Sequence, residues 1–318
     1  MKAEFETRVD AWNRYWKGGH GDTCFHQGDV FSLRRDWVGF FSELPASARI
    51  LDLATGNGAL PLIAAEVSRE MSLGFSITGV DFAVPTPELV ADIDTSLLDC
   101  ISFVGSTPLE TMELDEAGFD AVTSQFGFEY SDARRSIPRI AKLMAPGCKL
   151  RFLIHSHGGS VFKSTEQRCG RIKQLLAKDQ LFDVCRRLGR FNPRDPASLA
   201  KTQKLERRFN AKLKSLRAKT TDLPPDDVSV YAMNYVEQLV QSRSYAPPDE
   251  WRKALNDLSD ELNDYVIRLN GMLRAAQKDA DMKRLVTSFE EAGLEDVSYQ
   301  PALQNQNDVG WIFLATKR

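Results

Sequence analysis

The stretch Arg49-Ile50-Leu51-Asp52-Leu53-Ala54-Thr55-Gly56-Asn57-Gly58-Ala59-Leu60 decides the fold of this 318-residue chain. Its apolar run ends at an acid and a Gly-x-Gly turn, which is the pattern of a buried parallel strand. The apolar residues that follow, up to Val67, recur at helical spacing. We therefore predict a strand, a tight loop and a helix. Glycines let a backbone approach a ligand closely, and the free N–H groups at a helix start favour an anion or a carboxylate.

Two kinds of nucleotide site use such a loop. The dinucleotide fingerprint requires G-x-G-x-x-G and an acid about 20 residues further on. In this chain Pro61 takes the place of the third glycine, and the acid at the end of the next strand, Asp81, comes late. A nicotinamide oxidoreductase is therefore disfavoured. The pattern Asp52-x-x-x-Gly56-x-Gly58 instead resembles the nucleotide-binding motif of class I S-adenosylmethionine-dependent methyltransferases, and this resemblance covers residues 49–157 and 283–318.

Strands and helices then follow in the order of that family. We predict strands over residues 75–81, 101–104, 119–124 and 148–155, and a helix over 282–292 that precedes strands at 297–300 and 311–316. A helix followed by a strand pair at the C-terminal end is what the methyltransferase sheet implies. We expect an α/β fold with a doubly wound sheet of seven strands, six of them parallel and the last antiparallel.

The resemblance assigns cofactor contacts to the carboxyl ends of these strands. Asp81 matches the acid that binds both ribose hydroxyls, although a helix cap or a turn acid would look the same. An acid that often binds adenine is replaced by Ser106 or Thr107, and Phe82 either stacks on the ring or belongs to the core. The segment from Phe119 to Tyr130 resembles the ubiquinone-biosynthesis-like branch, and an aromatic wall suits a sulfonium through cation–π attraction. The implied cofactor-binding residues are Asp52, Ala54, Gly56, Gly58, Asp81, Phe82, Ser106, Thr107, Ser124, Gln125 and Phe126.

The acceptor and any catalytic base are less clearly marked. By the resemblance, residues 1–48 form an N-terminal helical cap, whose aromatic stripe either lines the acceptor pocket or docks the helix on the core. The implied substrate-binding residues are Tyr15, Trp16, His20 and Phe128. His155 and His157 end a predicted strand at the ligand-binding edge, and a neutral imidazole there can remove the acceptor's proton. His155, His157 and Tyr130 are therefore the catalytic candidates, unless these histidines are structural or no base is needed.

The sequence predicts a helical insertion over residues 160–280, between the two parts of the cofactor-binding domain at 49–159 and 281–318. Proline breaks separate segments of helical periodicity in this region. Residues 160–220 carry 17 Lys and Arg against 5 Asp and Glu. Such a basic stripe is either the footprint of RNA or of an anionic substrate, or the solvated face of helices balanced by acids elsewhere. We interpret the insertion as a lid or a substrate-recognition domain.

Composition limits the remaining choices. A chain with 42% hydrophobic and 27% charged residues and no apolar run of about 18 residues suggests a globular protein without a membrane partner. Residues 1–6 lack the apolar core of a signal peptide. Five scattered cysteines without a C-x-x-C pair favour reduced thiols, a cytoplasmic location and no metal site. The net charge of −3 predicts no general attraction to nucleic acid.

These observations predict an S-adenosylmethionine-dependent methyltransferase that acts on O or N of a small-molecule acceptor. Two alternatives stay open. The first is an RNA or protein methyltransferase that uses the basic insertion. The second is a non-catalytic, cofactor-binding partner protein whose long helices form an interface, and a homodimer through the insertion would fit that arrangement. The acceptor itself is not encoded in any motif, because fold does not determine substrate.

Overall fold

The computed structural model of the chain describes residues 2–21, 30–115, 117–192, 195–304 and 306–318. The chain forms two compact units. Met1–Ser164 and Gly271–Arg318 make up the first, which we call the sheet unit, and Thr165–Asn270 make up the second, the helical unit. The predicted division of the chain at residues 48, 159 and 280 stays a prediction.

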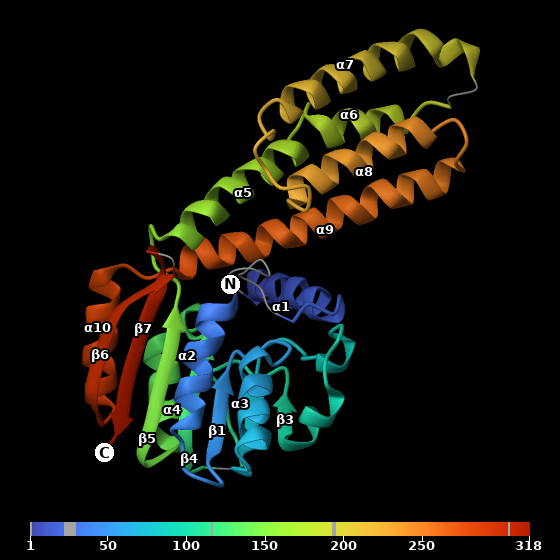
Figure 1. Cartoon of the computed structure of the whole chain (residues 1–318). Coiled ribbons are helices and arrows are strands. Elements are labelled where there is room, and N and C mark those ends of the chain that lie inside the picture. Colours follow the sequence, from blue (N-terminus) through green and yellow to red (C-terminus); the bar gives the residue numbers. More distant parts are fainter. Residues whose placement is uncertain (1, 22–29, 116, 193–194, 305) are drawn as a thin grey trace. The chain divides into compact units, whose positions relative to one another are not determined.

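The sheet unit contains one sheet of seven strands (Figure 1). The strands are β1 (Arg49–Leu53), β2 (Ser76–Val80), β3 (Ile101–Val104), β4 (Phe119–Gln125), β5 (Met144–Ile154), β6 (Leu294–Gln304) and β7 (Asn307–Lys317). Their order is β3-β2-β1-β4-β5-β7-β6, and β7 is antiparallel to both of its neighbours. The other strands run parallel, which confirms the predicted seven-stranded doubly wound fold.

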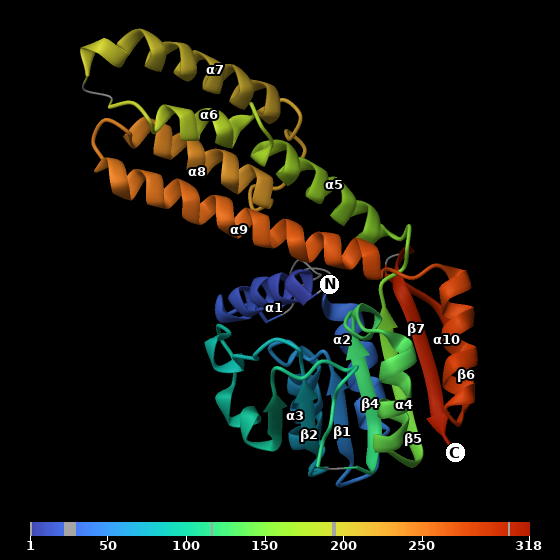
Figure 2. The same cartoon turned by 180° about the vertical axis from the view of Figure 1, so that it is seen from behind.

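Helices cover both faces of this sheet (Figures 1 and 2). One hydrophobic cluster joins α2 (Val30–Ser42) and α3 (Ala59–Glu70) to one face, and another joins α4 (Ala133–Leu143) and α10 (Asp279–Glu291) to the opposite face. Adjacent residues of β1 alternate, since Ile50 belongs to the first cluster and Leu51 to the second. The strand is apolar throughout because both of its faces are buried.

The sheet reverses its direction of growth at β1, whose neighbours are β2 on one side and β4 on the other. Loops that leave the carboxyl ends of β1 and β4 therefore diverge, and a crevice opens between them. In doubly wound folds ligands bind at this switch point. The helix α1 (Lys2–Lys17) belongs to the same unit and contributes side chains to this edge of the sheet.

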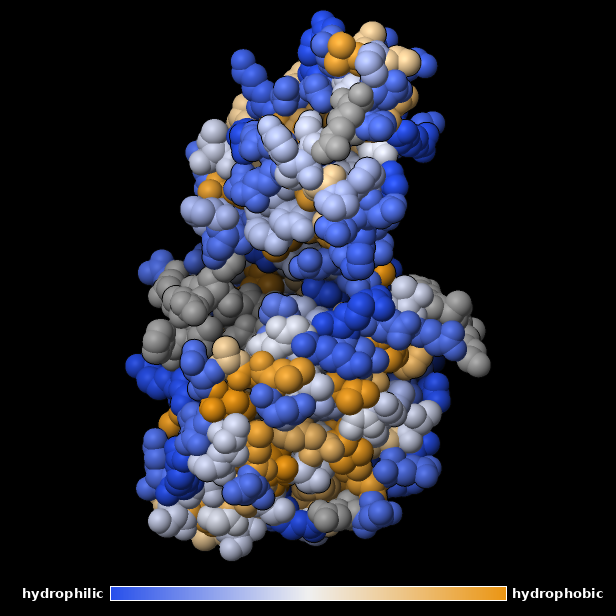
Figure 3. Space-filling view, turned by 90° about the vertical axis from the view of Figure 1, so that its right-hand side faces the viewer, coloured by the Kyte–Doolittle hydropathy of each residue, from blue (hydrophilic) through white to orange (hydrophobic). Residues whose placement is uncertain are grey.

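The helical unit is built from α6 (Leu181–Leu188), α7 (Leu199–Arg217), α8 (Val228–Ser242) and most of α5 (Ser160–Leu176) and α9 (Pro248–Ala275). Its own core is apolar and contains buried residues of all five helices, such as Phe182, Phe209 and Trp251. Its visible face in the upper part of Figure 3 is mostly hydrophilic. In the described part of the chain, no helix combines the length and the apolar character needed to cross a membrane.

Candidate active site

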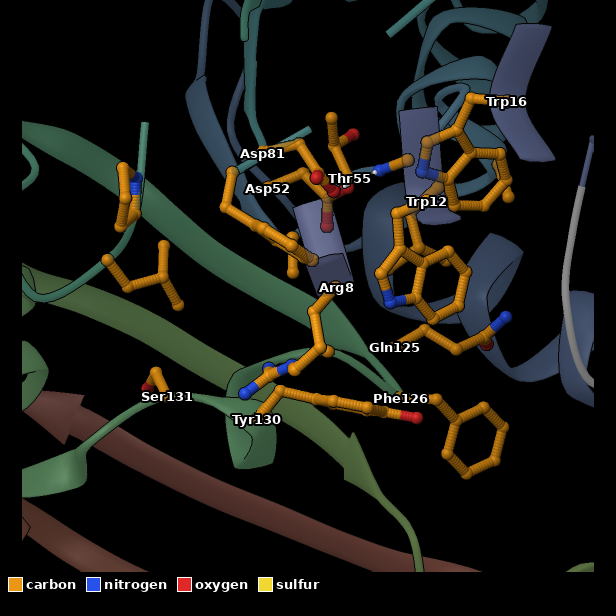
Figure 4. Close-up of a pocket in the computed structure, with 18 of the residues that line it drawn as sticks. Arg8, Trp12, Trp16, Asp52, Thr55, Asp81, Gln125, Phe126, Tyr130 and Ser131 are labelled. Atoms are coloured by element: carbon orange, nitrogen blue, oxygen red, sulfur yellow. Dashed lines mark hydrogen bonds between the residues drawn. The ribbon is translucent and has the colours of Figure 1, made fainter. Parts of the chain in front are cut away.

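A cavity that is open to solvent at its mouth lies at the carboxyl ends of β1, β2 and β4 (Figure 4). The helix α1 and the loop that follows β3 complete its wall. The side chains and backbone that line it belong to Phe5, Arg8, Trp12, Trp16, Gly21, Asp52, Ala54, Thr55, Gly56, Ala59, Leu60, Asp81, Phe82, Pro108, Leu109, Glu110, Gln125, Phe126, Gly127, Tyr130 and Ser131.

Both glycines of the glycine loop lie close against aromatic rings. Gly56 has φ +55°, in the left-handed region, and a Cβ placed on it would lie 2.5 Å from the ring of Trp16. Only glycine fits both constraints. Gly58 has φ +87° but does not line the cavity, and a Cβ there would lie 2.7 Å from the ring of Phe103. Gly56 thus leaves room for the ring of Trp16 beside the cavity, whereas Gly58 leaves room for the ring of Phe103 outside it.

Asn57, between the two glycines, fastens the N-terminal segment to the loop. Its amide nitrogen donates to the backbone oxygens of Trp16, at 3.0 Å, and His20, at 2.8 Å. Its side-chain oxygen accepts from the backbone N–H of Thr86 at 2.8 Å. Because Asn57 is 1% exposed, these bonds are made away from water. The end of α1 is therefore positioned over the glycine loop by a residue that the sequence motif leaves unspecified.

Asp81, at the end of β2, is 3% exposed. One carboxylate oxygen accepts from the N–H of Gly56 at 2.8 Å, and the other accepts from the N–H of Ala83 at 2.7 Å. Burial raises the pKa of Asp81 to about 6, although these two hydrogen bonds favour the ionised form. Each oxygen keeps a further lone pair for a ligand hydroxyl. Asp81 thus both braces the glycine loop and faces the cavity.

A second buried carboxylate, Asp52, stands in β1 on the same side of the cavity. It accepts a hydrogen bond of 2.8 Å from the hydroxyl of Thr123. Burial raises the pKa of Asp52 to about 7, and the nearby charge of Asp81 adds to this rise. The cavity therefore has one acidic end, formed by two carboxylates that are partly protonated near neutral pH.

These raised pKa values predict that ligand affinity depends on pH. A hydroxyl ligand bound by Asp81 favours the carboxylate, so affinity for S-adenosylhomocysteine should rise with pH and level off above the pKa of about 6. The dissociation constant should be about tenfold higher at pH 5 than at pH 7 if only the ionised form binds. Calorimetric titration at pH 5, 6, 7 and 8 measures this change.

The same raised pKa values have the opposite effect on the stability of the ligand-free protein. Between about pH 4 and pH 7 the folded state binds more protons at Asp52 and Asp81 than the unfolded state does, so their contribution to stability falls as pH rises.

An affinity for S-adenosylhomocysteine that stays constant from pH 5 to pH 8 would contradict a role of these carboxylates in binding.

The carboxyl end of β4 carries the next part of the site. Gln125 lines the cavity, and its side-chain oxygen accepts a hydrogen bond of 2.6 Å from the indole of Trp37 in α2. Phe126 has φ +55° and Ala54, at the end of β1, has φ +52°. Non-glycine residues in this region are strained, and such strain is concentrated at functional sites. Both strained residues line the cavity.

Ser124, predicted beside the cofactor, is fully buried instead and does not line the cavity. Its hydroxyl donates to the backbone oxygen of Leu53 at 2.9 Å and accepts from the N–H of Phe128 at 3.0 Å. It therefore joins the ends of β1 and β4. Phe128, predicted in the acceptor pocket, packs in the core with its ring centroid 4.8 Å from that of Phe152.

The loop after β3 departs from the expected adenine contacts. Ser106 is exposed with φ +55°, and the hydroxyl of Thr107 donates to the backbone oxygen of Gly105 at 3.0 Å. Neither residue lines the cavity, whereas the next two, Pro108 and Leu109, do. The left-handed turn at Ser106 places the following apolar residues, and not the hydroxyls, in the wall.

Aromatic rings from α1 cover the cavity. Trp12 stacks on Trp16, with ring centroids 5.5 Å apart, and its edge meets Tyr130 at 6.4 Å. Trp16 lines the cavity as predicted for a pocket residue, and Phe82 does so as well. The predicted pocket residues Tyr15 and His20 stack on each other at 4.1 Å and do not line the cavity. The rings of Trp12, Trp16 and Tyr130 thus form the aromatic wall together with Phe126.

Of the three catalytic candidates, only Tyr130 lines the cavity. His155 is 1% exposed, its Nδ1 lies 2.6 Å from a carboxylate oxygen of Glu129, and its backbone N–H donates to the same oxygen at 2.9 Å. Its ring packs behind Phe126, with centroids 4.3 Å apart. His157 is exposed and lies against Phe162. Both histidines follow the carboxyl end of β5, but neither side chain lines the cavity.

Sequence reasoning missed several cavity residues, above all Phe5, Arg8, Trp12 and Glu110. A signal for three of them was present. Phe5, Arg8, Trp12 and Trp16 are spaced by three or four residues, so they occupy one face of a helix. Continuing the aromatic stripe towards the N-terminus would have identified Arg8.

Comparison with known proteins finds relatives that are named methyltransferases. No family model matches the chain. Over 141 residues, it is 29% identical to an uncharacterized methyltransferase of Mycobacterium tuberculosis, a match that covers 44% of this chain and 48% of the relative. Over 106 residues, it is 32% identical to demethylmenaquinone methyltransferase of Thermus thermophilus, covering 33% of this chain and 46% of the relative. The chain thus spans about half the length of the curated relatives it matches.

Solved structures of methyltransferases also resemble it. Phosphoethanolamine N-methyltransferase 2 of Haemonchus contortus, in complex with S-adenosyl-L-methionine, has a TM-score of 0.36 and 13% identity over 98% of this chain and 56% of that chain. An S-adenosylmethionine-dependent methyltransferase from Mesorhizobium loti has a TM-score of 0.30 and 23% identity over 38% of this chain and 53% of that chain.

Proposed function

We propose that the chain transfers a methyl group from S-adenosylmethionine to O or N of a small-molecule acceptor. Its seven-stranded sheet and its glycine loop resemble those of class I S-adenosylmethionine-dependent methyltransferases. The observation that carries the proposal is the cavity at the switch point of the sheet. It combines the buried carboxylates Asp52 and Asp81 with the aromatic side chains of Trp12, Phe126 and Tyr130.

The residues present fit the cofactor. Asp81 offers two carboxylate oxygens to the ribose hydroxyls, and the side chain of Phe82 stands beside it for the adenine ring. Gln125 and Asp52 would hold the methionyl part. When bound, S-adenosylmethionine supplies an electrophilic methyl group on a sulfonium. Aromatic faces attract such a cation by about 0.5–2 kcal/mol.

The protein's own contribution to the reaction would be chiefly orientation. The helix α1 is fastened to the glycine loop by Asn57, so Trp12 and Trp16 would cover part of the bound reactants and limit their contact with water. Holding the two reactants in line accounts for up to about 7–11 kcal/mol of barrier lowering in favourable cases. The hydroxyl of Tyr130 would hold the acceptor's nucleophilic atom or take its proton, since this side chain lines the cavity.

The proposal is tested by the fate of a labelled methyl group. The full-length protein is incubated with S-adenosylmethionine carrying a tritiated methyl group and with a small-molecule extract. We expect label in new acid-soluble products, and we expect excess S-adenosylhomocysteine to suppress it. Label that appears only in acid-precipitable RNA or protein would contradict a small-molecule acceptor.

One observation favours a second candidate, an RNA methyltransferase. In α7, Lys201, Lys204 and Lys214 are exposed and form no ion pair with any residue that the structure describes, while Arg208 and Arg217 pair with Asp179 and Glu237. Unpaired cations along one helix suit a phosphate backbone. More often, such cations face only solvent.

Replacement of Lys201, Lys204, Arg207 and Lys214 by Gln separates these alternatives. RNA binding through α7 predicts a weaker affinity for single-stranded RNA and a log–log salt slope that is shallower by about 0.7 for each phosphate that the variant no longer neutralises. The small-molecule proposal predicts no change in label transfer to acid-soluble products. A filter-binding assay between 50 and 200 mM salt measures the slope, since nucleic-acid affinity carried by several phosphates falls by about 10³–10⁵ over this range.

A further inference from the structure

We infer that the methyl acceptor is an anion, a carboxylate or a phosphate on an apolar body, and that Arg8 binds its charged group. This inference rests on the proposed function, because it assigns the part of the same cavity that the cofactor would leave free. It deepens that function by naming the chemical class of the acceptor.

The side chain of Arg8 extends away from the two carboxylates of the cavity (Figure 4). In that view its guanidinium extends towards Tyr130 and Ser131, while Asp52 and Asp81 lie together near the glycine loop. The cavity therefore presents the carboxylates of Asp52 and Asp81 near the glycine loop and a guanidinium towards Tyr130. The two carboxylates match ribose hydroxyls and a sulfonium, and the guanidinium matches an oxyanion.

No residue in the described part of the chain forms a hydrogen bond or an ion pair with Arg8, although it is half-buried. Three other arginines of the sheet unit form ion pairs: Arg34 with Glu66, Arg69 with Asp94, and Arg139 with Glu113. A guanidinium withdrawn from water without a partner loses hydration and gains nothing in return. A ligand oxyanion would supply the missing partner.

The carboxylates of the cavity are engaged elsewhere. Asp81 accepts from Gly56 and Ala83, and Asp52 accepts from Thr123. Glu110 also lines the cavity, but one of its carboxylate oxygens accepts from the N–H of Asp132 at 2.8 Å. None of the three is paired with Arg8, so the guanidinium is available to a ligand.

The neighbours of Arg8 define the rest of the acceptor. Trp12 and Tyr130 meet edge to face, and both line the cavity beside it. The hydroxyl of Ser131, which donates to the backbone oxygen of Phe128 at 2.8 Å, can still accept a hydrogen bond. An arginine fork binds carboxylate or phosphate with two parallel hydrogen bonds, and the rings would pack on an aromatic body. An aromatic oxyanion satisfies both features.

The test uses three probes of similar size, namely benzoate, phenyl phosphate and benzamide, titrated into full-length protein saturated with S-adenosylhomocysteine. At least one of the two anions should bind about tenfold more tightly than neutral benzamide, and the better anion identifies the group that is recognised. Arg8→Gln should abolish this preference. Arg35→Gln is the matched control, since Arg35 is exposed and does not line the cavity, and it should leave the preference unchanged.

A second arm separates the acceptor from the cofactor's own carboxylate. Affinity for S-adenosylhomocysteine and for 5′-methylthioadenosine, which lacks the amino-acid part, is measured for wild-type protein and Arg8→Gln. We expect a change of less than about threefold for both ligands. A tenfold loss confined to S-adenosylhomocysteine would mean that Arg8 holds the cofactor carboxylate, which would overturn the inference.

Failure of the inference and failure of the proposed function are distinguishable. Equal binding of all three probes by wild-type protein would overturn the acceptor class while leaving cofactor binding intact. Failure of wild-type protein to bind S-adenosylhomocysteine would contradict the proposed function itself. The anion titration without that ligand would then still decide whether Arg8 binds an oxyanion.

Discussion

Replacing Asp81 by Ala is expected to weaken binding of S-adenosylhomocysteine by a factor of ten or more. The wild-type carboxylate would accept hydrogen bonds from both ribose hydroxyls, and hydrogen bonds to charged groups contribute about 1.5–3 kcal/mol each. The substitution also removes the acceptor for the N–H groups of Gly56 and Ala83, so the glycine loop loses its brace. Calorimetric titration gives the change in the dissociation constant.

Asp94→Ala is the matched control for this prediction. Asp94 is half exposed, pairs with Arg69 on the surface and lies outside the cavity, so its loss should not alter the affinity for S-adenosylhomocysteine. Asp81→Asn keeps one acceptor oxygen and should bind more tightly than Asp81→Ala. An Asp81→Ala protein that folds and binds as tightly as wild type would exclude Asp81 from the cofactor site.

The second large effect concerns stability. Glu129→Ala should lower the free energy of unfolding by about 2–5 kcal/mol, because one oxygen of Glu129 accepts from the backbone N–H of His155 and also lies 2.6 Å from its Nδ1. The side chains of both residues are almost completely buried, so the substitution removes the buried acceptor of the His155 backbone N–H and the contact to its Nδ1. Urea denaturation monitored by circular dichroism gives the midpoint and the free energy.

Two further variants show whether this pair, and not a general loss of a carboxylate, is responsible. Glu129→Gln keeps an oxygen that accepts a hydrogen bond, so it should cost less than Glu129→Ala. Glu113→Ala removes a surface carboxylate that is 88% exposed and 3.8 Å from Arg139, and its cost should lie within about 1 kcal/mol of zero. A loss below about 1 kcal/mol for Glu129→Ala would show that His155 is satisfied without the carboxylate.

The sheet could be predicted because its signals are local. The strand β1 is a short apolar run with both faces buried, and the seven strands occur in the expected order. Asp81 could be placed at the ligand edge for the same reason, since a strand that ends at Val80 delivers the next residue there. Gly56, Gln125 and Trp16, which the sequence also named as site residues, line the cavity.

Local sequence patterns could not predict side-chain positions that depend on contacts between residues far apart in the chain. His155 turns towards Glu129, 26 positions away in the chain, and no sequence pattern reveals such a pair. Asn57 reaches back to Trp16, 41 positions away, and so fixes where α1 lies. Ser106 is turned out of the site by its left-handed backbone, which a serine seldom adopts. Tertiary contacts therefore decided what local patterns left open.

Methyl transfer and recognition of an anionic acceptor both require that the switch-point cavity binds S-adenosylmethionine. Calorimetric titration of the full-length protein with S-adenosylhomocysteine, with NADH as the comparator, measures this binding. We expect S-adenosylhomocysteine to bind in the micromolar range and NADH not to bind. Heat from NADH together with none from S-adenosylhomocysteine would contradict the cofactor assignment and indicate a nicotinamide site in its place.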